Sequence, residues 1–248
     1  MKASLLILGG TADASELAKQ ACNIPGLEVR VSLAGRTSQP GDISGIVRIG
    51  GFGGIDGLIT YLRAENIDLL IDATHPFASQ ISWNAAAAVQ KVGIPCLMLV
   101  RPQWEKDEND NWVEVESVQT AADILPSFAK RVFLTIGRQQ LAPFAHLDNI
   151  WFLMRAIDPP SDIPLPQGKL LLARGPFSLE DEKKLLLDYE IDTIVSKNSG
   201  GSATYAKIVA ARELGIKVVI VQRAAMPAGE KVADVEGAVE WLLNKLKL

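Results

Sequence analysis

Short, apolar, aliphatic runs alternate with helix-like segments along nearly the whole chain, and this alternation restricts the possible folds most strongly. The first run, SLLILGG at 4–10, precedes a helical pattern, and further strand-like runs follow in EVRVSLAG at 28–35, DLLIDAT at 68–74 and CLMLVR at 96–101. Strands without polar alternation are buried on both faces, as in parallel sheets that helices cover on both sides. The sequence therefore predicts an α/β protein with mainly parallel, Rossmann-like sheets.

The alternation divides into two parts of similar size. Residues 1–101 form the first part, and the polar stretch PQWEKDENDNW at 102–112 has no periodicity and is predicted to be a linker. The pattern resumes over 113–248, where a last helix is expected near 235–247. We expect two Rossmann-like domains, 1–101 and 113–248, with a cleft between them at the ends of the strands.

Composition excludes several classes of protein. A net charge of −4 argues against a general nucleic-acid binder, which would carry a basic surplus. The longest apolar runs are far shorter than the roughly 18 residues of a membrane span, and the N-terminal run is too short for a signal peptide. Cys22 and Cys96 form neither a disulfide framework nor a metal motif. A cytoplasmic protein without metal or membrane partners is expected.

A glycine turn follows the first predicted strand in LILGGTADASELA. Gly9, Gly10 and Thr11 stand directly before a helix, whose first turn offers free N–H groups to a phosphate. The dinucleotide fingerprint GxGxxG would place glycine at 9, 11 and 14, where this chain has Gly9, Thr11 and Ala14. The motif is degenerate, and phosphate binding is favoured over a plain tight turn.

The segment after the second predicted strand indicates which nucleotide would bind. It reads Gly35-Arg36-Thr37, and no carboxylate occurs before Asp42. NAD-binding folds carry an acidic residue here for the ribose 2′-hydroxyl, whereas arginine accommodates a 2′-phosphate. This pattern favours NADPH, and the alternative is a solvated loop arginine.

A second glycine-rich stretch, GGFGG at 50–54, follows the third predicted strand. Four glycines around one aromatic residue suggest a backbone that lies close to a ligand, with Gly51 and Phe52 near the adenine or ribose. A merely flexible loop fits the pattern equally well.

The corner IDATHPFA at 71–78 joins the fourth predicted strand to a helix. Thr74 could bond a phosphate or ribose, and Pro76 suits the first position of the following helix. His75 has two interpretations: it positions the reacting end of the cofactor, or it donates a proton. Asp72 could hold the corner together or contact a ligand.

Strand ends in the second half carry cations beside glycine. Arg138 follows Gly137, Arg174 precedes Gly175, and Lys197 begins the stretch KNSGG. Because parallel strands end at one edge, these residues predict a site for a polyanionic ligand, against the alternative of separate solvated loops. The predicted substrate-binding residues are Arg138, Arg174, Lys197, Asn198, Ser199, Gly200 and Gly201.

Taken together, these motifs resemble the NADPH-dependent precorrin-6A reductases of cobalamin biosynthesis and their cobalt-precorrin-6A counterparts. DATHPFA at 72–78 and SKNSGG at 196–201, in this order, are the specific features. The resemblance also covers AGRT at 34–37, TIGR at 135–138 and ARGPF at 173–177. One departure is Asp13-Ala14-Ser15, where relatives are expected to carry a Glu-Ala-Arg-like stretch.

The resemblance implies that NADPH reduces one double bond of a tetrapyrrole macrocycle, precorrin-6A or its cobalt form, to give precorrin-6B. Arg138, Arg174 and Lys197 would hold the carboxylates of the macrocycle, and neighbouring enzymes of the pathway are candidate partners. The alternatives are an NADP-dependent reductase of another polyanionic substrate and a non-redox, two-domain nucleotide-binding protein.

Overall fold

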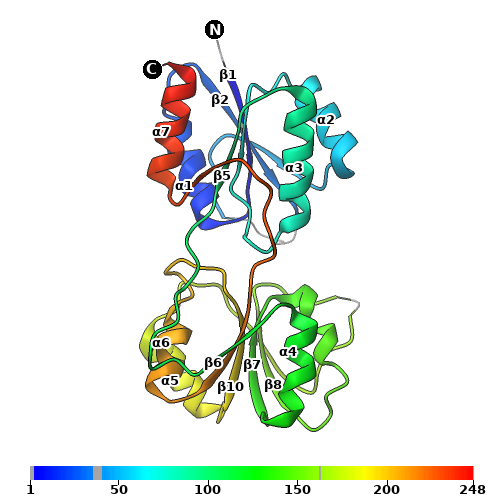
Figure 1. Ribbon diagram of the computed structural model, residues 1–248, viewed down its shortest axis with the longest axis vertical. Helices are drawn as coiled ribbons and strands as arrows, with labels where there is room; N and C mark the ends of the chain where they lie inside the picture. Colours follow the sequence, from blue (N-terminus) through cyan, green and yellow to red (C-terminus); the bar gives the residue numbers. More distant parts are fainter. Residues whose placement is uncertain (1–2, 36–40, 162, 248) are drawn as a thin grey trace. The chain divides into compact units, whose positions relative to one another are not determined.

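The computed structural model describes residues 3–35, 41–161 and 163–247. They form two compact units (Figure 1). The first unit combines residues 1–102 with 225–248, and the second comprises residues 103–224. The chain therefore passes from the first unit to the second and returns at its C-terminal end.

The first unit is built on a parallel six-stranded sheet with the order β12-β5-β4-β1-β2-β3. The order reverses between β1 and β4, which is the topological switch point of a doubly wound sheet. Its strands are β1 (Ala3–Leu8), β2 (Leu27–Leu33), β3 (Ile46–Ile49), β4 (Leu69–Asp72), β5 (Cys96–Leu99) and β12 (Glu230–Val232).

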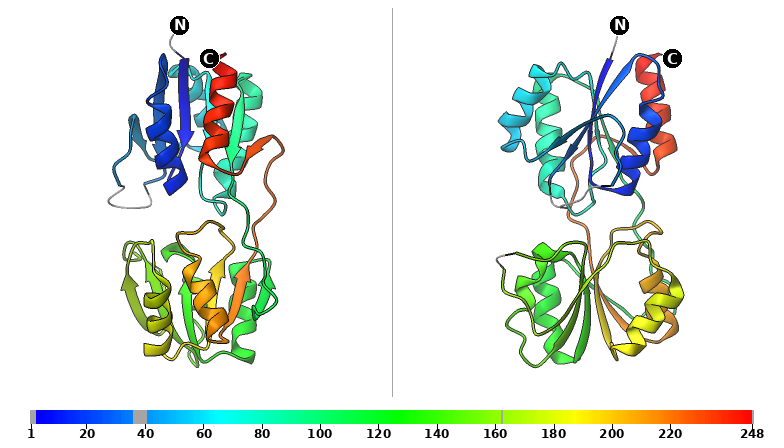
Figure 2. Two further views of the ribbon diagram at one scale, coloured as in Figure 1. Left: turned by 90° about the vertical axis from the view of Figure 1, so that its left-hand side faces the viewer. Right: turned by 180° about the vertical axis from the view of Figure 1, so that it is seen from behind.

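Helices cover both faces of this sheet, which explains the wholly apolar first strand. Leu5 and Ile7 pack with α1 (Ala12–Ala21) and α7 (Val235–Leu246). Leu6 and Leu8 face the other way and pack with α2 (Gly54–Ala64) and α3 (Ser79–Val92). Figure 2 shows α1 and α7 on one side of the sheet and α2 and α3 on the other. Successive side chains of a strand point to opposite faces, so each face needs its own apolar set.

The second unit repeats the architecture with the strand order β6-β11-β10-β7-β8-β9, again entirely parallel. Here α5 (Leu179–Asp188) and α6 (Ala206–Glu213) cover one face, and α4 (Val118–Ile124) covers the other. The strands are β6 (Trp112–Val115), β7 (Arg131–Thr135), β8 (Trp151–Ala156), β9 (Gly168–Leu172), β10 (Thr193–Lys197) and β11 (Lys217–Val221). The predicted α/β class with parallel sheets is confirmed.

The predicted boundary of the second domain is wrong at its C-terminal end. The last helix presents the expected apolar face, but it packs on α1 of the first unit. Directly before it, β12 pairs with β5, with Lys231 opposite Met98. The three residues of β12, EKV, carry no apolar pattern that would mark a strand. The prediction therefore followed the order of the chain and placed residues 225–248 in the wrong unit.

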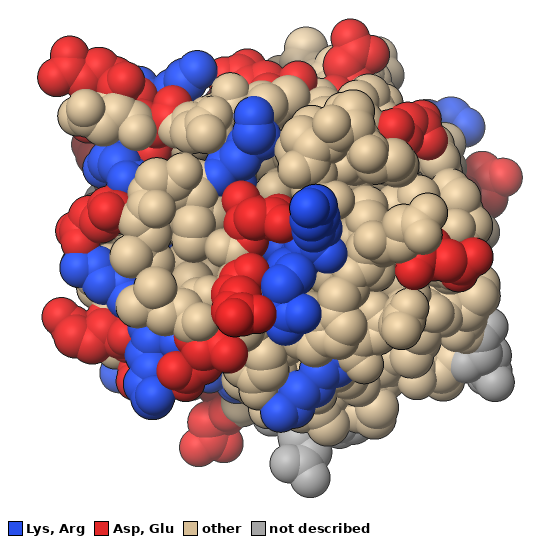
Figure 3. Space-filling model, turned by 90° about the horizontal axis from the view of Figure 1, so that it is seen from below, with Lys and Arg blue, Asp and Glu red and all other residues tan. Residues whose placement is uncertain are grey.

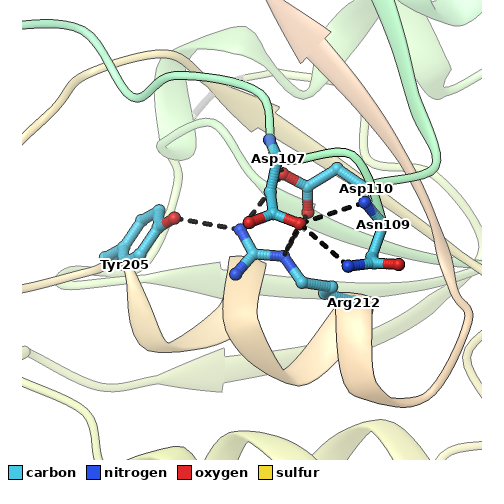
Figure 4. A network of polar contacts seen from close by, with 5 residues as sticks. All are labelled: Asp107, Asn109, Asp110, Tyr205 and Arg212. Carbon is cyan, nitrogen blue, oxygen red and sulfur yellow. Dashed lines mark hydrogen bonds and ion pairs between the residues drawn. The ribbon is translucent and has the colours of Figure 1, made fainter.

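The predicted linker at 102–112 is also wrong, because the segment is anchored to the second unit. Arg212 of α6 donates from Nε to Asp110 Oδ1 at 2.9 Å and from Nη2 to Asp110 Oδ2 at 3.1 Å (Figure 4). Arg212 Nη2 also donates to the Tyr205 hydroxyl at 3.0 Å. These hydrogen bonds raise the pKa of Arg212, and a backbone hydrogen bond from Asn109 lowers the pKa of Asp107. The segment is therefore held in place by Arg212, which lies about 100 residues further along the chain.

Surface charge is mixed rather than segregated on the face drawn in Figure 3. Lysine and arginine lie interspersed with aspartate and glutamate, without the continuous basic surface typical of nucleic-acid binding. In the part of the chain that the structure describes, no helix is both long and apolar enough to cross a membrane.

Candidate active site

The glycine turn lies where β1 ends at the switch point of the first sheet. Gly10 adopts a φ of +111°, which favours glycine, and apart from its chain neighbours no described residue has a heavy atom within 4 Å of the position that a Cβ would take. A Cβ on Gly9 would instead lie 3.1 Å from Val31 Cγ1. Gly9 therefore serves close packing, while Gly10 leaves an open backbone surface that a ligand can approach.

Thr11 joins this turn to the end of β4. Its hydroxyl accepts from the Ala14 N–H at 3.1 Å, which caps α1, and donates to the Ala73 carbonyl at 2.8 Å. The hydroxyl proton is therefore used inside the protein. Thr11 holds the two strand ends of the switch point together, and its side chain does not donate to a phosphate in this arrangement.

The start of α1 supplies the donors for an anionic group. Because the helix begins at Ala12, the N–H groups of Ala12 and Asp13 have no intrahelical acceptor. The Asp13 carboxylate alone would disfavour an anion here, but Arg101 Nη1 lies 3.5 Å from Asp13 Oδ2 and offsets its charge. The open turn and these backbone donors fit the pyrophosphate of a dinucleotide.

The predicted 2′-phosphate site is described only in part. Gly35 is exposed, with a φ of +71°, after the end of β2. Arg36 and Thr37 lie outside the described residues.

The glycine-rich loop after β3 is organised by an arginine that the sequence analysis missed. Arg48 Nη1 donates to Gly50 O at 2.5 Å and Arg48 Nη2 donates to Gly51 O at 2.7 Å. The guanidinium also lies 4.0 Å from the centroid of the Phe52 ring. The signal was present in the sequence, since Arg48 lies near the end of a predicted strand, two residues before GGFGG.

Asp72 holds the corner after β4. It is buried, and its Oδ1 accepts from both the Thr74 N–H at 3.0 Å and the Thr74 hydroxyl at 2.6 Å. The Thr74 hydroxyl can still accept a hydrogen bond from a ribose hydroxyl, but its proton is not free for a phosphate.

Pro76 does not start the following helix, so that prediction is wrong. The Ala78 N–H donates to the His75 carbonyl at 2.7 Å and closes a turn with Pro76 at its second position, which suits the fixed φ of proline. The helix α3 begins only at Ser79.

The same turn fixes the tautomer of His75. Its Nδ1 accepts a hydrogen bond from the Phe77 N–H at 3.2 Å. A neutral imidazole that accepts at Nδ1 carries its proton at Nε2. The half-buried His75 therefore carries its proton at Nε2 in the neutral form, and a local backbone contact holds the ring.

The three predicted cations of the second unit lie at carboxyl ends of parallel strands. Arg138 follows β7, Lys197 ends β10 beside it, and Arg174 follows β9 at the edge of the sheet. Arg138 Nη1 donates to the Pro159 carbonyl at 2.7 Å. The strands place the three residues along one rim of the sheet.

Asn198, which was predicted to bind substrate, has an internal role. It is buried; its Oδ1 accepts from the Trp104 N–H at 2.8 Å, and its Nδ2 donates to the Trp104 carbonyl at 3.1 Å. The adjacent residues Ser199, Gly200 and Gly201 form the turn that leads toward α6. Gly201 O accepts from Trp104 Nε1 at 2.8 Å, so the Trp104 side chain also holds this turn in place.

A buried charged cluster supports the same rim. Lys207 Nζ donates to Thr204 O at 2.7 Å, and burial lowers the pKa of Lys207 to about 7. Arg155 Nη1 lies 2.6 Å from the buried Glu182 Oε1, and its guanidinium stacks 3.7 Å from the centroid of the Phe177 ring. The cluster fixes the segments that follow Arg174 and Lys197, and no motif in the sequence indicated it.

Two Rossmann-like units, with a glycine turn at one switch point and cations at the strand ends of the other sheet, define a class of dinucleotide-dependent α/β enzymes. The chain belongs to the precorrin-6x reductase CbiJ/CobK family, whose model matches residues 4–243. It is therefore an oxidoreductase that acts on a carbon–carbon double bond of a precorrin macrocycle in cobalamin biosynthesis, and its class implies a nicotinamide cofactor.

Individual relatives agree over the whole length. The chain is 49% identical over 239 residues to a precorrin-6A reductase of Rhodococcus erythropolis, covering 96% of both chains. It is 27% identical to a cobalt-precorrin-6A reductase of Priestia megaterium, covering 98% of this chain and 99% of the relative. A solved CobK precorrin-6A reductase, 42% identical, superposes with a TM-score of 0.91 and covers 98% of this chain and 96% of its own. The family resemblance is confirmed, and the two alternative functions fall away.

Proposed function

We propose that the protein uses NADPH to reduce metal-free precorrin-6A to precorrin-6B. The observation that carries the proposal is the hydrogen bond from Thr11 to Ala73, which fixes the glycine turn and the His75 corner as one piece. A pyrophosphate site and a proton donor at adjacent strand ends are what a dinucleotide-dependent reductase needs.

The choice of NADPH over NADH is supported by the residues after β2. The segment 35–41 contains Arg36 and no carboxylate, and an acidic residue is the usual partner of the 2′-hydroxyl in NAD. Arg36 and Thr37 are proposed to bind the 2′-phosphate, with Gly35, Gly51 and Phe52 beside the adenosine.

Bound NADPH would supply a hydride, and the protein would supply orientation and charge. The backbone of the Gly9-Gly10 turn, which is open at Gly10, and the first turn of α1 bind the pyrophosphate. The Thr74 hydroxyl accepts a hydrogen bond from a ribose hydroxyl, and Pro76 keeps the corner rigid. His75 positions the reacting end with its Nε2–H, which can also donate the proton that completes the reduction.

Recognition of the macrocycle is assigned to the rim of the second unit. Arg138, Arg174 and Lys197 would pair with its carboxylates, and the backbone at Ser199, Gly200 and Gly201 would provide further donors. Asn198 acts indirectly, because its side chain holds this turn against Trp104.

The metal-free substrate is favoured by the pattern of relatives. Precorrin-6A reductases are 42–49% identical to the chain, whereas the cobalt-precorrin-6A reductases are 27–31% identical.

A two-by-two steady-state experiment tests the proposal. Purified protein would be incubated anaerobically with precorrin-6A or cobalt-precorrin-6A and with NADPH or NADH. The account predicts the highest kcat/KM for metal-free precorrin-6A with NADPH. A preference for NADH would overturn the cofactor assignment, and a preference for the cobalt form would overturn the substrate assignment.

A further inference from the structure

Arg48 is held firmly at the carboxyl end of the first sheet. It lies opposite Ser32 in the pairing of β2 with β3, and its Nη1 reaches Ser32 Oγ at 3.3 Å. The guanidinium also donates to Gly50 O and Gly51 O, so the loop after β3 holds it as well. Three acceptors on two strand ends thus define where this cation lies.

All three of these acceptors are uncharged, so none of them neutralises the positive charge of Arg48. None of the ion pairs among the described residues includes Arg48. A guanidinium carries five N–H groups, and the three bonds leave Nε–H and one N–H of Nη2 for another acceptor. The side chain is half-buried, so solvent screens this charge only in part.

An aromatic surface backs the cation. The guanidinium lies 4.0 Å from the Phe52 centroid and 5.3 Å from the Tyr61 centroid, and the two rings contact edge to face at 5.2 Å. Such stacking orients the flat guanidinium and leaves its edge as the donor.

The loop around Arg48 is open to a ligand. Gly50 and Gly53 have φ values of +120° and +79°, and among the described residues, chain neighbours aside, no heavy atom lies within 4 Å of a Cβ built on either. Gly53 also caps α2 without a side-chain hydrogen bond, so the first N–H groups of that helix stay uncapped. Asp56 in this first turn offsets part of the positive potential.

We propose that Arg48, stacked on Phe52, is a specificity-determining residue that recognises the adenosine 2′-phosphate of the cofactor. This proposal rests on the proposed use of NADPH. The adenosine end of a dinucleotide lies beyond the strands on the β2 side of the switch point, which is where β3 and its glycine loop end. A rigid, uncompensated guanidinium there suits a phosphate dianion, which NADH lacks.

The alternative is that Arg48 only orders the glycine loop, and the two roles differ in their effect on the two cofactors. Dissociation constants of NADPH, NADH, 2′,5′-ADP and 5′-AMP would be measured on the full-length protein by calorimetry or fluorescence. For Arg48→Gln we expect NADPH and 2′,5′-ADP to bind about tenfold to a hundredfold more weakly, with NADH and 5′-AMP within about threefold of wild type.

Two further variants serve as controls. Arg48→Lys keeps the charge without the stacked fork, so it should retain part of the preference for the 2′-phosphate. It also covers the case in which Arg48→Gln fails to fold. Phe52→Leu removes the aromatic surface and should weaken NADPH and NADH by similar, smaller factors.

The proposal would be overturned if Arg48→Gln lost the same factor in affinity for ligands with and without the 2′-phosphate. If only Arg48→Lys folds, the proposal would be overturned when that variant no longer binds NADPH more tightly than NADH. Even with either of these results, the proposed function stands as long as the wild type binds NADPH more tightly than NADH. If the wild type itself binds NADPH and NADH equally, the cofactor assignment and the role of Arg48 both fall.

Discussion

The side-chain amide of Asn198 forms a pair of hydrogen bonds with the backbone of Trp104, although the two residues are 94 positions apart. The amide accepts from the Trp104 N–H and donates to the Trp104 carbonyl, so it satisfies both polar groups of a buried backbone segment. The contact fixes the start of the second unit to the turn at 199–201, which carries proposed substrate donors.

Asn198→Ala should lower the free energy of unfolding by about 2–4 kcal/mol, because it leaves a buried N–H and a buried carbonyl without partners. Urea denaturation measures the loss. Ser199→Ala is the matched control next to it; it keeps the backbone N–H groups of the turn and should change stability by less than about 0.5 kcal/mol. Equal stabilities for the two variants would contradict the internal role of Asn198.

The hydrogen bond from the Phe77 N–H to His75 Nδ1 gives a prediction for catalysis. His75→Ala should slow turnover by about tenfold to a hundredfold, at the low end of acid–base effects. His75→Asn keeps an acceptor near the position of Nδ1 and should recover part of this loss if positioning dominates. A loss of about ten-thousandfold in both variants would instead make His75 an essential proton donor.

Arg36 gives a prediction that rests on the sequence alone. Arg36→Ala should weaken the binding of NADPH by about 1–3 kcal/mol, which is the range for a charged hydrogen bond, and should leave the binding of NADH nearly unchanged. Titration of both cofactors on the folded variant measures the difference. A loss of the same size for NADH would remove Arg36 from the 2′-phosphate site.

Lys207 should make stability depend on pH. Burial lowers its pKa to about 7 in the folded protein from the ordinary 10.5, with Arg155 lowering it further and Glu182 opposing both. Between these two values the unfolded chain binds the proton and the folded chain does not. Stability from this group therefore rises with pH across the window, by up to about 1.4 kcal/mol per pH unit.

Lys207→Met should remove this rise, so its stability relative to wild type should fall between pH 7 and pH 9 in urea denaturation. Lys184→Met is the control, since Asp188 raises the pKa of the exposed Lys184 by a hydrogen bond, above the window. Parallel pH curves for wild type and Lys207→Met would show that the buried amine does not titrate there.

The fold was predictable because its main signal is local. Residues 5–8 are apolar without alternation, and only a sheet covered on both faces buries both Leu6 and Ile7. The return of the chain was not predictable, since β12 pairs with β5 across more than 130 residues and its sequence, EKV, has no strand pattern. The polar segment at 102–112 misled for a similar reason, because Asp110 finds its partner only in Arg212.

The sequence predicted where the site residues lie better than it predicted what their side chains do. The glycine turn and the corner at 72–76 lie at neighbouring strand ends, as expected. However, the side chains of Thr11 and Asn198 serve the protein's own backbone, and residue type alone does not distinguish an internal hydrogen bond from one to a ligand. Arg48 was missed because its importance depends on the loop that folds around it.

The most direct test of the central claim is the transfer of deuterium from the cofactor to the macrocycle. Precorrin-6A would be reduced anaerobically with NADPH deuterated at both C4 positions, and the product mass would be measured. The account predicts a product heavier than the substrate by one deuterium and one solvent proton, formed together with an equal amount of NADP. A product without deuterium, or oxidation of NADPH while the macrocycle stays unchanged, would contradict it.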